Sequence, residues 1–194
     1  MPFSNLQGSP AERVAREEKS VHDRLKGSKI SGASWYMTHN TKVAIFTMAL
    51  GITWGAGTVI MLFYNGVILG AVALDYALAG RSAFLLAWLS PHGVIEIPAI
   101  LLAGQAGLVL AGALIGWGSR TPRRKRLRQV SGDLVTLCTG VAVMLVWAGF
   151  IEAFISQYHE PVLPYSFKTG FAFAELLLLV LFLARSGAKE NGRP

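Results

Sequence analysis

Long apolar runs restrict the fold of this chain more than any other feature of its sequence. Val43–Tyr64 and Val130–Ser156 are each long enough, as helices, to cross a lipid bilayer whose hydrocarbon core is about 30 Å thick. The chain is 53% hydrophobic and 15% charged, which is typical of an integral membrane protein. Because backbone groups in lipid must form hydrogen bonds within the protein, we predict an all-α, polytopic transmembrane helix bundle.

The other apolar segments are Val94–Gly118, Thr169–Ala184, Gly66–Gly80 and Ser82–Ser90. The last two are too short to cross the membrane as straight helices. We expect either two short tilted helices separated by Arg81 or a re-entrant hairpin, preceded by a turn at Asn65-Gly66. Asp75 and Arg81 lie near the same end, where they are expected to form a salt bridge or to reach toward the membrane interface.

The polar and charged residues divide the chain into three parts. Residues 1–41 form an N-terminal segment that contains a possible amphipathic helix at 10–26, residues 42–185 form the transmembrane domain, and residues 186–194 form a tail. The loop at 119–129 is rich in arginine and lysine and has no acidic residue. By the positive-inside rule, we expect the N-terminal segment, this loop and the tail on the cytoplasmic side, and no binding of nucleic acid.

One polar stretch interrupts the apolar segments, at residues 90–99: Ser-Pro-His-Gly-Val-Ile-Glu-Ile-Pro-Ala. A helix that begins at Pro91 would project His92 and Glu96 from one face, because they are four residues apart. Ionisable groups at membrane depth usually face a bundle interior or a wet cavity. The predicted topology also places Glu152 in the outer half of the membrane. We therefore predict a polar intramembrane site made of His92, Glu96 and Glu152.

Three kinds of chemistry fit this site. His92, Glu96 and Glu152 could bind a proton, or they could bind zinc or iron as weak candidates for metal ligands. The site could also be structural, with Glu96 bonded to backbone groups that Pro91 and Pro98 leave unpaired. The sequence lacks the His-Glu-x-x-His, phosphate-loop and Gly-x-Ser-x-Gly patterns, so we expect neither an enzyme nor a cofactor. Glu96→Ala is expected to be more damaging than Glu175→Ala.

Small residues recur at a spacing of four in two segments. The residues predicted to pack against other helices are Gly51, Gly55, Ala99, Ala103, Gly107 and Ala111. Small side chains let helix backbones approach closely within a membrane. We expect these faces to form contacts within the chain or across a homo-oligomer interface.

Residues 91–99, Pro-His-Gly-Val-Ile-Glu-Ile-Pro-Ala, resemble the signature of the stage II sporulation protein M family. Further similarities are the glycine cluster Gly51–Gly57, Asn65-Gly66 and the run Ile151–Ile155, so that the resemblance covers about residues 40–185. It implies a polytopic helical protein of the bacterial or archaeal cytoplasmic membrane, with both termini cytoplasmic. It also implies that Asn65, His92, Glu96 and Glu152 form the polar site of the family.

The resemblance implies a function as well. In spore-forming bacteria the family member is similar to a membrane anchor that recruits cell-wall-degrading enzymes, and relatives occur in organisms that do not sporulate. We therefore predict a non-enzymatic, homo-oligomeric scaffold in the lipid bilayer that binds membrane or cell-envelope proteins. The alternative is a channel or transporter for ions or small solutes that uses His92, Glu96 and Glu152. A metal-dependent intramembrane enzyme is the third hypothesis.

Overall fold

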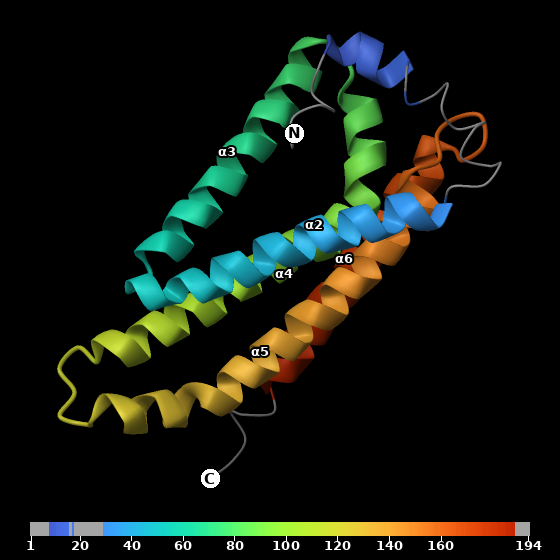
Figure 1. Cartoon of the computed structure of the whole chain (residues 1–194). Coiled ribbons are helices and arrows are strands. Elements are labelled where there is room, and N and C mark those ends of the chain that lie inside the picture. The colour runs from blue at the N-terminus through green and yellow to red at the C-terminus, as the bar shows by residue number, and fades with distance from the viewer. Residues whose placement is uncertain (1–7, 16, 18–28, 189–194) are drawn as a thin grey trace.

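The structure is a computed structural model that describes residues 8–15, 17 and 29–188, with only the backbone of 29–38 and 186–188. Every regular element within these ranges is a helix, which confirms the all-α fold class. The elements are α2 (Lys29–Ala49), the 3₁₀ turn η2 (Leu50–Thr53), α3 (Ala56–Leu78), α4 (Ser82–Ile115), α5 (Arg123–Ile151), the π-helical turn η3 (Glu152–Ser156) and α6 (Tyr165–Ala188) (Figure 1).

Four helical stretches in the described part of the chain are long and apolar enough to cross a membrane. They are Ala56–Leu78, Ser82–Ile115, Arg123–Ser156 and Tyr165–Arg185. The prediction of a polytopic membrane protein is therefore confirmed at this level. α2 lies outside this group, and it begins within the segment 1–41 that the sequence assigned to the N-terminal region. Of the predicted helix at 10–26, residues 10–15 and 17 are helical and the others lie outside the described residues.

The predicted first span, Val43–Tyr64, is wrong, because the chain reverses direction within it. α2 ends at Ala49, η2 follows, and Trp54 and Gly55 both have positive φ before α3 begins. The reversal depends on a close backbone approach: a Cβ atom at Gly51 would lie 2.2 Å from the carbonyl oxygen of Gly107. Glycine is the residue that permits both the positive φ at Gly55 and the contact at Gly51.

The predicted division of residues 65–93 is correct at Arg81 but wrong at both of its ends. Asn65-Gly66 lies in the middle of α3 rather than in a turn, and the Asn65 side-chain amide donates to the Met61 carbonyl oxygen of the same helix (2.7 Å). The separation predicted at Arg81 is confirmed, because α3 ends at Leu78 and α4 begins at Ser82, with a turn at 79–81 in which Gly80 has φ +68°. Ser82–Ser90 is the start of α4, so the two short helices or re-entrant hairpin are replaced by two long helices. Asp75 pairs with Arg13 rather than with Arg81.

α4 passes through the polar stretch without ending. Pro91 and Pro98 both lie inside this helix, and each removes a backbone donor from the helical hydrogen bonds. Figure 1 shows that α4 changes direction between its first turns and its longer second part. Prolines inside a helix are the usual cause of such a bend.

α4 is the central helix and packs against α2, α3, α5 and α6. One core cluster joins Ala44 of α2 to Ala99 and Ala103 of α4 and to Val141 and Leu145 of α5. α3 diverges from this core, as Figure 1 shows, and contacts other helices near both of its ends. At its start, Thr58 donates to the carbonyl oxygen of Thr47 (2.8 Å). Near its other end, Tyr76 packs in a second cluster with Phe84 and Leu85.

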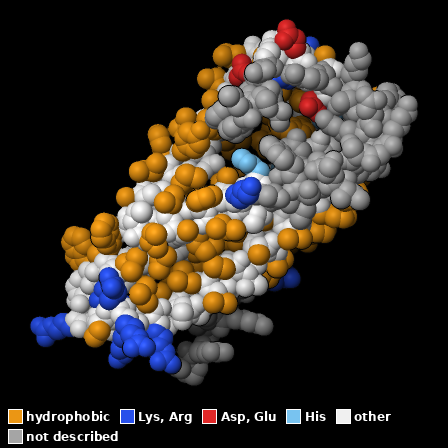
Figure 2. Space-filling model, viewed as in Figure 1, with side chains coloured by type: hydrophobic (Ala, Val, Ile, Leu, Met, Phe, Trp, Pro, Cys, Tyr) orange, Lys and Arg blue, Asp and Glu red, His pale blue; other side chains and the backbone are white. Residues whose placement is uncertain are grey.

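The two ends of the molecule differ in charge. Lys and Arg side chains gather at the end formed by the α4–α5 connection (Figure 2). The described N-terminal residues lie at the other end, where Val14 packs against Tyr76 and Phe84, and Arg13 lies over the Tyr76 ring. The sequence placed both regions on one side of the membrane. In this fold they lie at opposite ends of α4. The N-terminal residues pack beside the turn between α3 and α4, at the start of α4, whereas the basic connection follows the end of α4.

A buried histidine–carboxylate cluster beside a cavity

His92, Glu96 and Glu152 come together in the interior of the bundle. One possible ligand atom from each residue can be chosen so that the three lie within 4.8 Å of one another. His92 is 5% exposed and Glu152 is 3% exposed, while Glu96 is half-buried. α4 supplies the first two residues four positions apart, and η3, which directly follows α5, supplies the third. The structure thus brings together three of the four residues that the sequence assigns to the polar site.

The π-helical turn η3 positions Glu152 and a further polar residue, Ser156. The Gln157 amide donates to the Glu152 carbonyl oxygen (3.3 Å), a five-residue bond that widens the helix at this point. Nδ1 of His92 lies 2.8 Å from Oγ of Ser156. Single π-helical turns occur frequently at functional sites, since they redirect side chains that a regular helix would place elsewhere.

Two more polar residues support the cluster. The Lys168 ammonium is fully buried and donates to the carbonyl oxygen of Ser156 (2.9 Å). The Asn40 side chain forms a hydrogen bond with the Glu96 carboxylate. A buried charge is costly unless other groups pair with it, so these contacts offset part of the cost of burying Glu96 and Lys168.

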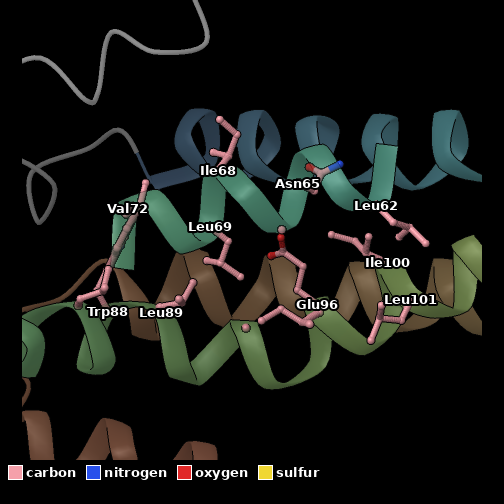
Figure 3. A pocket seen from close by; sticks show the side chains of 14 residues that line it. Leu62, Asn65, Ile68, Leu69, Val72, Trp88, Leu89, Glu96, Ile100 and Leu101 are labelled. Carbon is pink, nitrogen blue, oxygen red and sulfur yellow. The ribbon is translucent and has the colours of Figure 1, made fainter. Parts of the chain in front are cut away.

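A partly open cavity of about 360 Å³ lies beside the cluster, between α3 and α4. Its lining is mostly apolar, and Glu96 is its acidic residue (Figure 3). The Glu96 carboxylate points from α4 toward α3, on which Asn65 also lines the cavity. Asn65 therefore belongs to the cavity wall, across from Glu96, and the histidine–carboxylate cluster forms without it.

The intramembrane carboxylate of Glu175 forms a separate site. Its Oε1 accepts a hydrogen bond from the indole nitrogen of Trp147 (2.8 Å). A second apolar cavity is lined by both residues and by Ile95. Glu175 is 8% exposed and does not belong to the group formed by His92, Glu96 and Glu152, so it offers a matched control for their substitution.

The small residues of the sequence analysis lie at close helix contacts within the chain. Gly51 faces Gly107, and a Cβ at Gly55 would lie 3.2 Å from the methyl group of Ala111. Ala99 and Ala103 belong to the core cluster that α2, α4 and α5 share. These positions bring the start of α3 and the C-terminal part of α2 close to α4, and α4 in turn supplies His92 and Glu96.

Sequence analysis missed Asn40, Ser156 and Lys168. Ser156 had a detectable signal, because it follows Glu152 by four residues at the end of the same apolar run. Lys168 immediately precedes the predicted apolar segment Thr169–Ala184, but α6 begins earlier, at Tyr165, and Lys168 is buried. Asn40 lay in the polar segment 1–41, and nothing in the sequence indicates that α2 carries it to Glu96.

Comparison with known proteins agrees with the resemblance seen in residues 91–99. The family model described as stage II sporulation protein M matches residues 4–157. An uncharacterised protein of Methanocaldococcus jannaschii is 28% identical over 121 residues, which is 62% of this chain and 68% of that relative. No solved structure matches the chain. Since the family model covers well over half of the sequence, this chain belongs to the stage II sporulation protein M family.

Proposed function

We propose that this membrane protein transports a small cation, a proton or a metal ion, through the site formed by His92, Glu96 and Glu152. The observation that supports this proposal is the position of Glu96. Its side chain belongs both to the buried cluster and to the lining of the cavity between α3 and α4. A carboxylate that lies between a cavity and a buried polar site can take up a cation from the cavity and pass it to the buried site.

The charges of the cluster support the same proposal. Two carboxylates, Glu96 and Glu152, lie close together, and Glu152 is almost fully buried. Two like charges in a medium of low dielectric constant repel each other strongly unless a cation or a proton lies between them. Such a pair has a physical reason to bind a positive charge, and a transporter needs this property at its central site.

The scaffold predicted from the sequence stays a prediction. Among the described residues, the connections between the long helices are short: 79–81, 116–122 and 157–164. They offer little surface outside the membrane on which a partner protein could bind. Cross-linking in native membranes tests the hypothesis, which fails if contacts form only between copies of this chain. The family is not a known family of enzymes, and the metal-dependent enzyme remains the third hypothesis.

The location and orientation in the membrane are part of the proposal. We place the protein in the cytoplasmic membrane with the basic α4–α5 connection on the cytoplasmic side, because positive residues are retained there. α6 then returns to the cytoplasmic side, and the described N-terminal residues lie outside. This differs from the two cytoplasmic termini of the sequence analysis, and it follows from the packing of Val14 against Tyr76 and Phe84.

Flux of protons and metal cations into proteoliposomes tests the transport function. We expect the wild-type chain to conduct above the level of empty vesicles, Glu96→Gln to lose this flux, and Glu175→Gln to retain it. Glutamine keeps the shape of glutamate but removes the charge. All three proteins are compared at equal, correctly folded amounts, as judged by size-exclusion profile and thermal midpoint. Wild-type protein that conducts none of these cations, or equal flux in both variants, would refute the proposal.

A further inference from the structure

The three ligand atoms of the cluster lie near the geometry of a metal site. Atoms that are at most 4.8 Å apart surround a central point at a distance of about 2.8 Å or less. Zinc binds imidazole nitrogen and carboxylate oxygen at about 2.0–2.2 Å, which places tetrahedral ligands about 3.4 Å apart. The ligand atoms of His92, Glu96 and Glu152 would therefore each move by less than about 1 Å to hold such an ion.

Glu152 provides a second, independent observation. The residue is only 3% exposed, and its Oε2 atom is buried and has no hydrogen-bond partner among the described residues. A buried carboxylate oxygen without a partner costs free energy, and native proteins generally satisfy such atoms. An ion between Glu152 and the neighbouring His92 and Glu96 would satisfy it.

The surroundings of His92 match those of a metal-binding histidine. Such a residue usually donates from its second ring nitrogen to a nearby oxygen, which fixes the orientation of the ring. Here Nδ1 of His92 lies 2.8 Å from Oγ of Ser156, which leaves Nε2 for an ion. Lys168 donates to the carbonyl oxygen of Ser156, so the residue that orients His92 is itself anchored to α6.

The ligand types and charges limit the choice of ion. One imidazole nitrogen and carboxylate oxygens suit zinc, manganese and ferrous iron, whereas calcium and magnesium prefer oxygen alone and cuprous copper prefers sulfur. Two ionised carboxylates also cancel the charge of a divalent ion. Three protein ligands leave at least one coordination position for water, as in sites where the ion takes part in function.

We propose that His92, Glu96 and Glu152 bind a divalent ion of the first transition row, with Ser156 orienting His92. This inference rests on the proposed function in one respect, because it names the cation class of the same site. Binding itself does not require transport, so it can be measured on the purified protein without any flux.

Equilibrium dialysis with ZnCl₂ and MnCl₂, followed by metal analysis, tests the site on the full chain in detergent. We expect about one ion per chain for the wild type, as the three-ligand geometry implies. In Glu152→Gln we expect affinity to fall by more than roughly 100-fold, which exceeds the usual effect of replacing a residue that only orients a ligand. Glu175→Gln serves as the control and should bind like the wild type. No bound ion in the wild type, or equal binding in both variants, would overturn the proposal.

Two further measurements keep the test decisive if Glu152→Gln does not fold. Wild-type protein loaded with Co²⁺ should show visible absorption bands of nitrogen and oxygen coordination, and ZnCl₂ should raise its thermal midpoint. Absence of both effects overturns the site. A bound ion without flux would support the metal site and refute transport. Proton flux without a bound ion would support transport and refute the metal site.

Discussion

At the scale of single residues, the polar cluster was predictable in part. The spacing of His92 and Glu96 placed them on one helical face, and the topology placed Glu152 at the same depth. Asn40, Ser156 and Lys168 were not found, because each reaches the cluster through the packing of a different helix. A single sequence shows periodicity within one helix, but it does not show which neighbouring helix will supply a partner.

Replacement of Ser156 by alanine tests the contact that orients the His92 ring. We expect Ser156→Ala to weaken Zn²⁺ binding by roughly 10- to 100-fold, since the His92 ring loses the oxygen that orients it. The thermal midpoint of the metal-free protein, measured in parallel, should change little. Ser131→Ala is the control, because Ser131 is exposed and bonds only within α5, to the Arg128 carbonyl oxygen. Equal affinity in both variants would show that Ser156 does not position the ligand.

At the scale of helices, the sequence predicted the fold class and the break at Arg81 correctly, but the turn at η2 was missed and the turn at Asn65-Gly66 was wrong. The run Val43–Tyr64 has no charged residue to indicate a break, so it resembles one continuous span. The break at η2 arises from the approach of Gly51 to Gly107, a contact between distant segments that local propensity does not reveal. The turn at Asn65-Gly66 was predicted wrongly for the opposite reason. This dipeptide is typical of turns, but the Asn65 side chain forms its hydrogen bond within α3, to the Met61 carbonyl oxygen.

Gly51→Ala tests the contact between η2 and α4. The added methyl group would lie 2.2 Å from the Gly107 carbonyl oxygen, so the two backbones must separate. We expect a loss of about 1–3 kcal/mol in the free energy of unfolding, the usual cost of overpacking. Gly66→Ala is the control, since a Cβ at Gly66 meets no atom within 4 Å, and unfolding in mixed detergent measures both. A Gly51→Ala protein as stable as wild type would contradict this packing.

At the scale of the whole molecule, the arrangement of the helices supports the proposed orientation, which differs from the topology predicted by charge counting. Charge counting treats each polar segment separately and assigned the N-terminal segment to the cytoplasm with the basic loop. The packing of Val14 with Tyr76 and Phe84 joins the N-terminal residues to the α3–α4 turn, which lies at the other end of α4. The fold therefore separates the N-terminal residues from the basic connection, a relation that charge counting does not consider.

Labelling of single cysteines from one side of the membrane tests this orientation. We expect Ser9→Cys to react with an impermeant maleimide added to intact cells and Lys125→Cys to react only after permeabilisation. Both substitutions are made in a Cys138→Ser background, since Cys138 is the single native cysteine. Reaction of both positions from the same side would show that the N-terminal residues and the basic connection share one face of the membrane.

The partly open cavity between α3 and α4 also has a consequence for the lipids around the protein. It lies between two helices that are apolar enough to cross a membrane, and its walls are mostly hydrocarbon. In a bilayer, an acyl chain is then the natural competitor for this space, and a cation approaching Glu96 must displace it. Acyl chains that fill this space would thus act as competitive inhibitors of the proposed transport. The measured flux would then depend on the length and unsaturation of the lipids chosen for reconstitution.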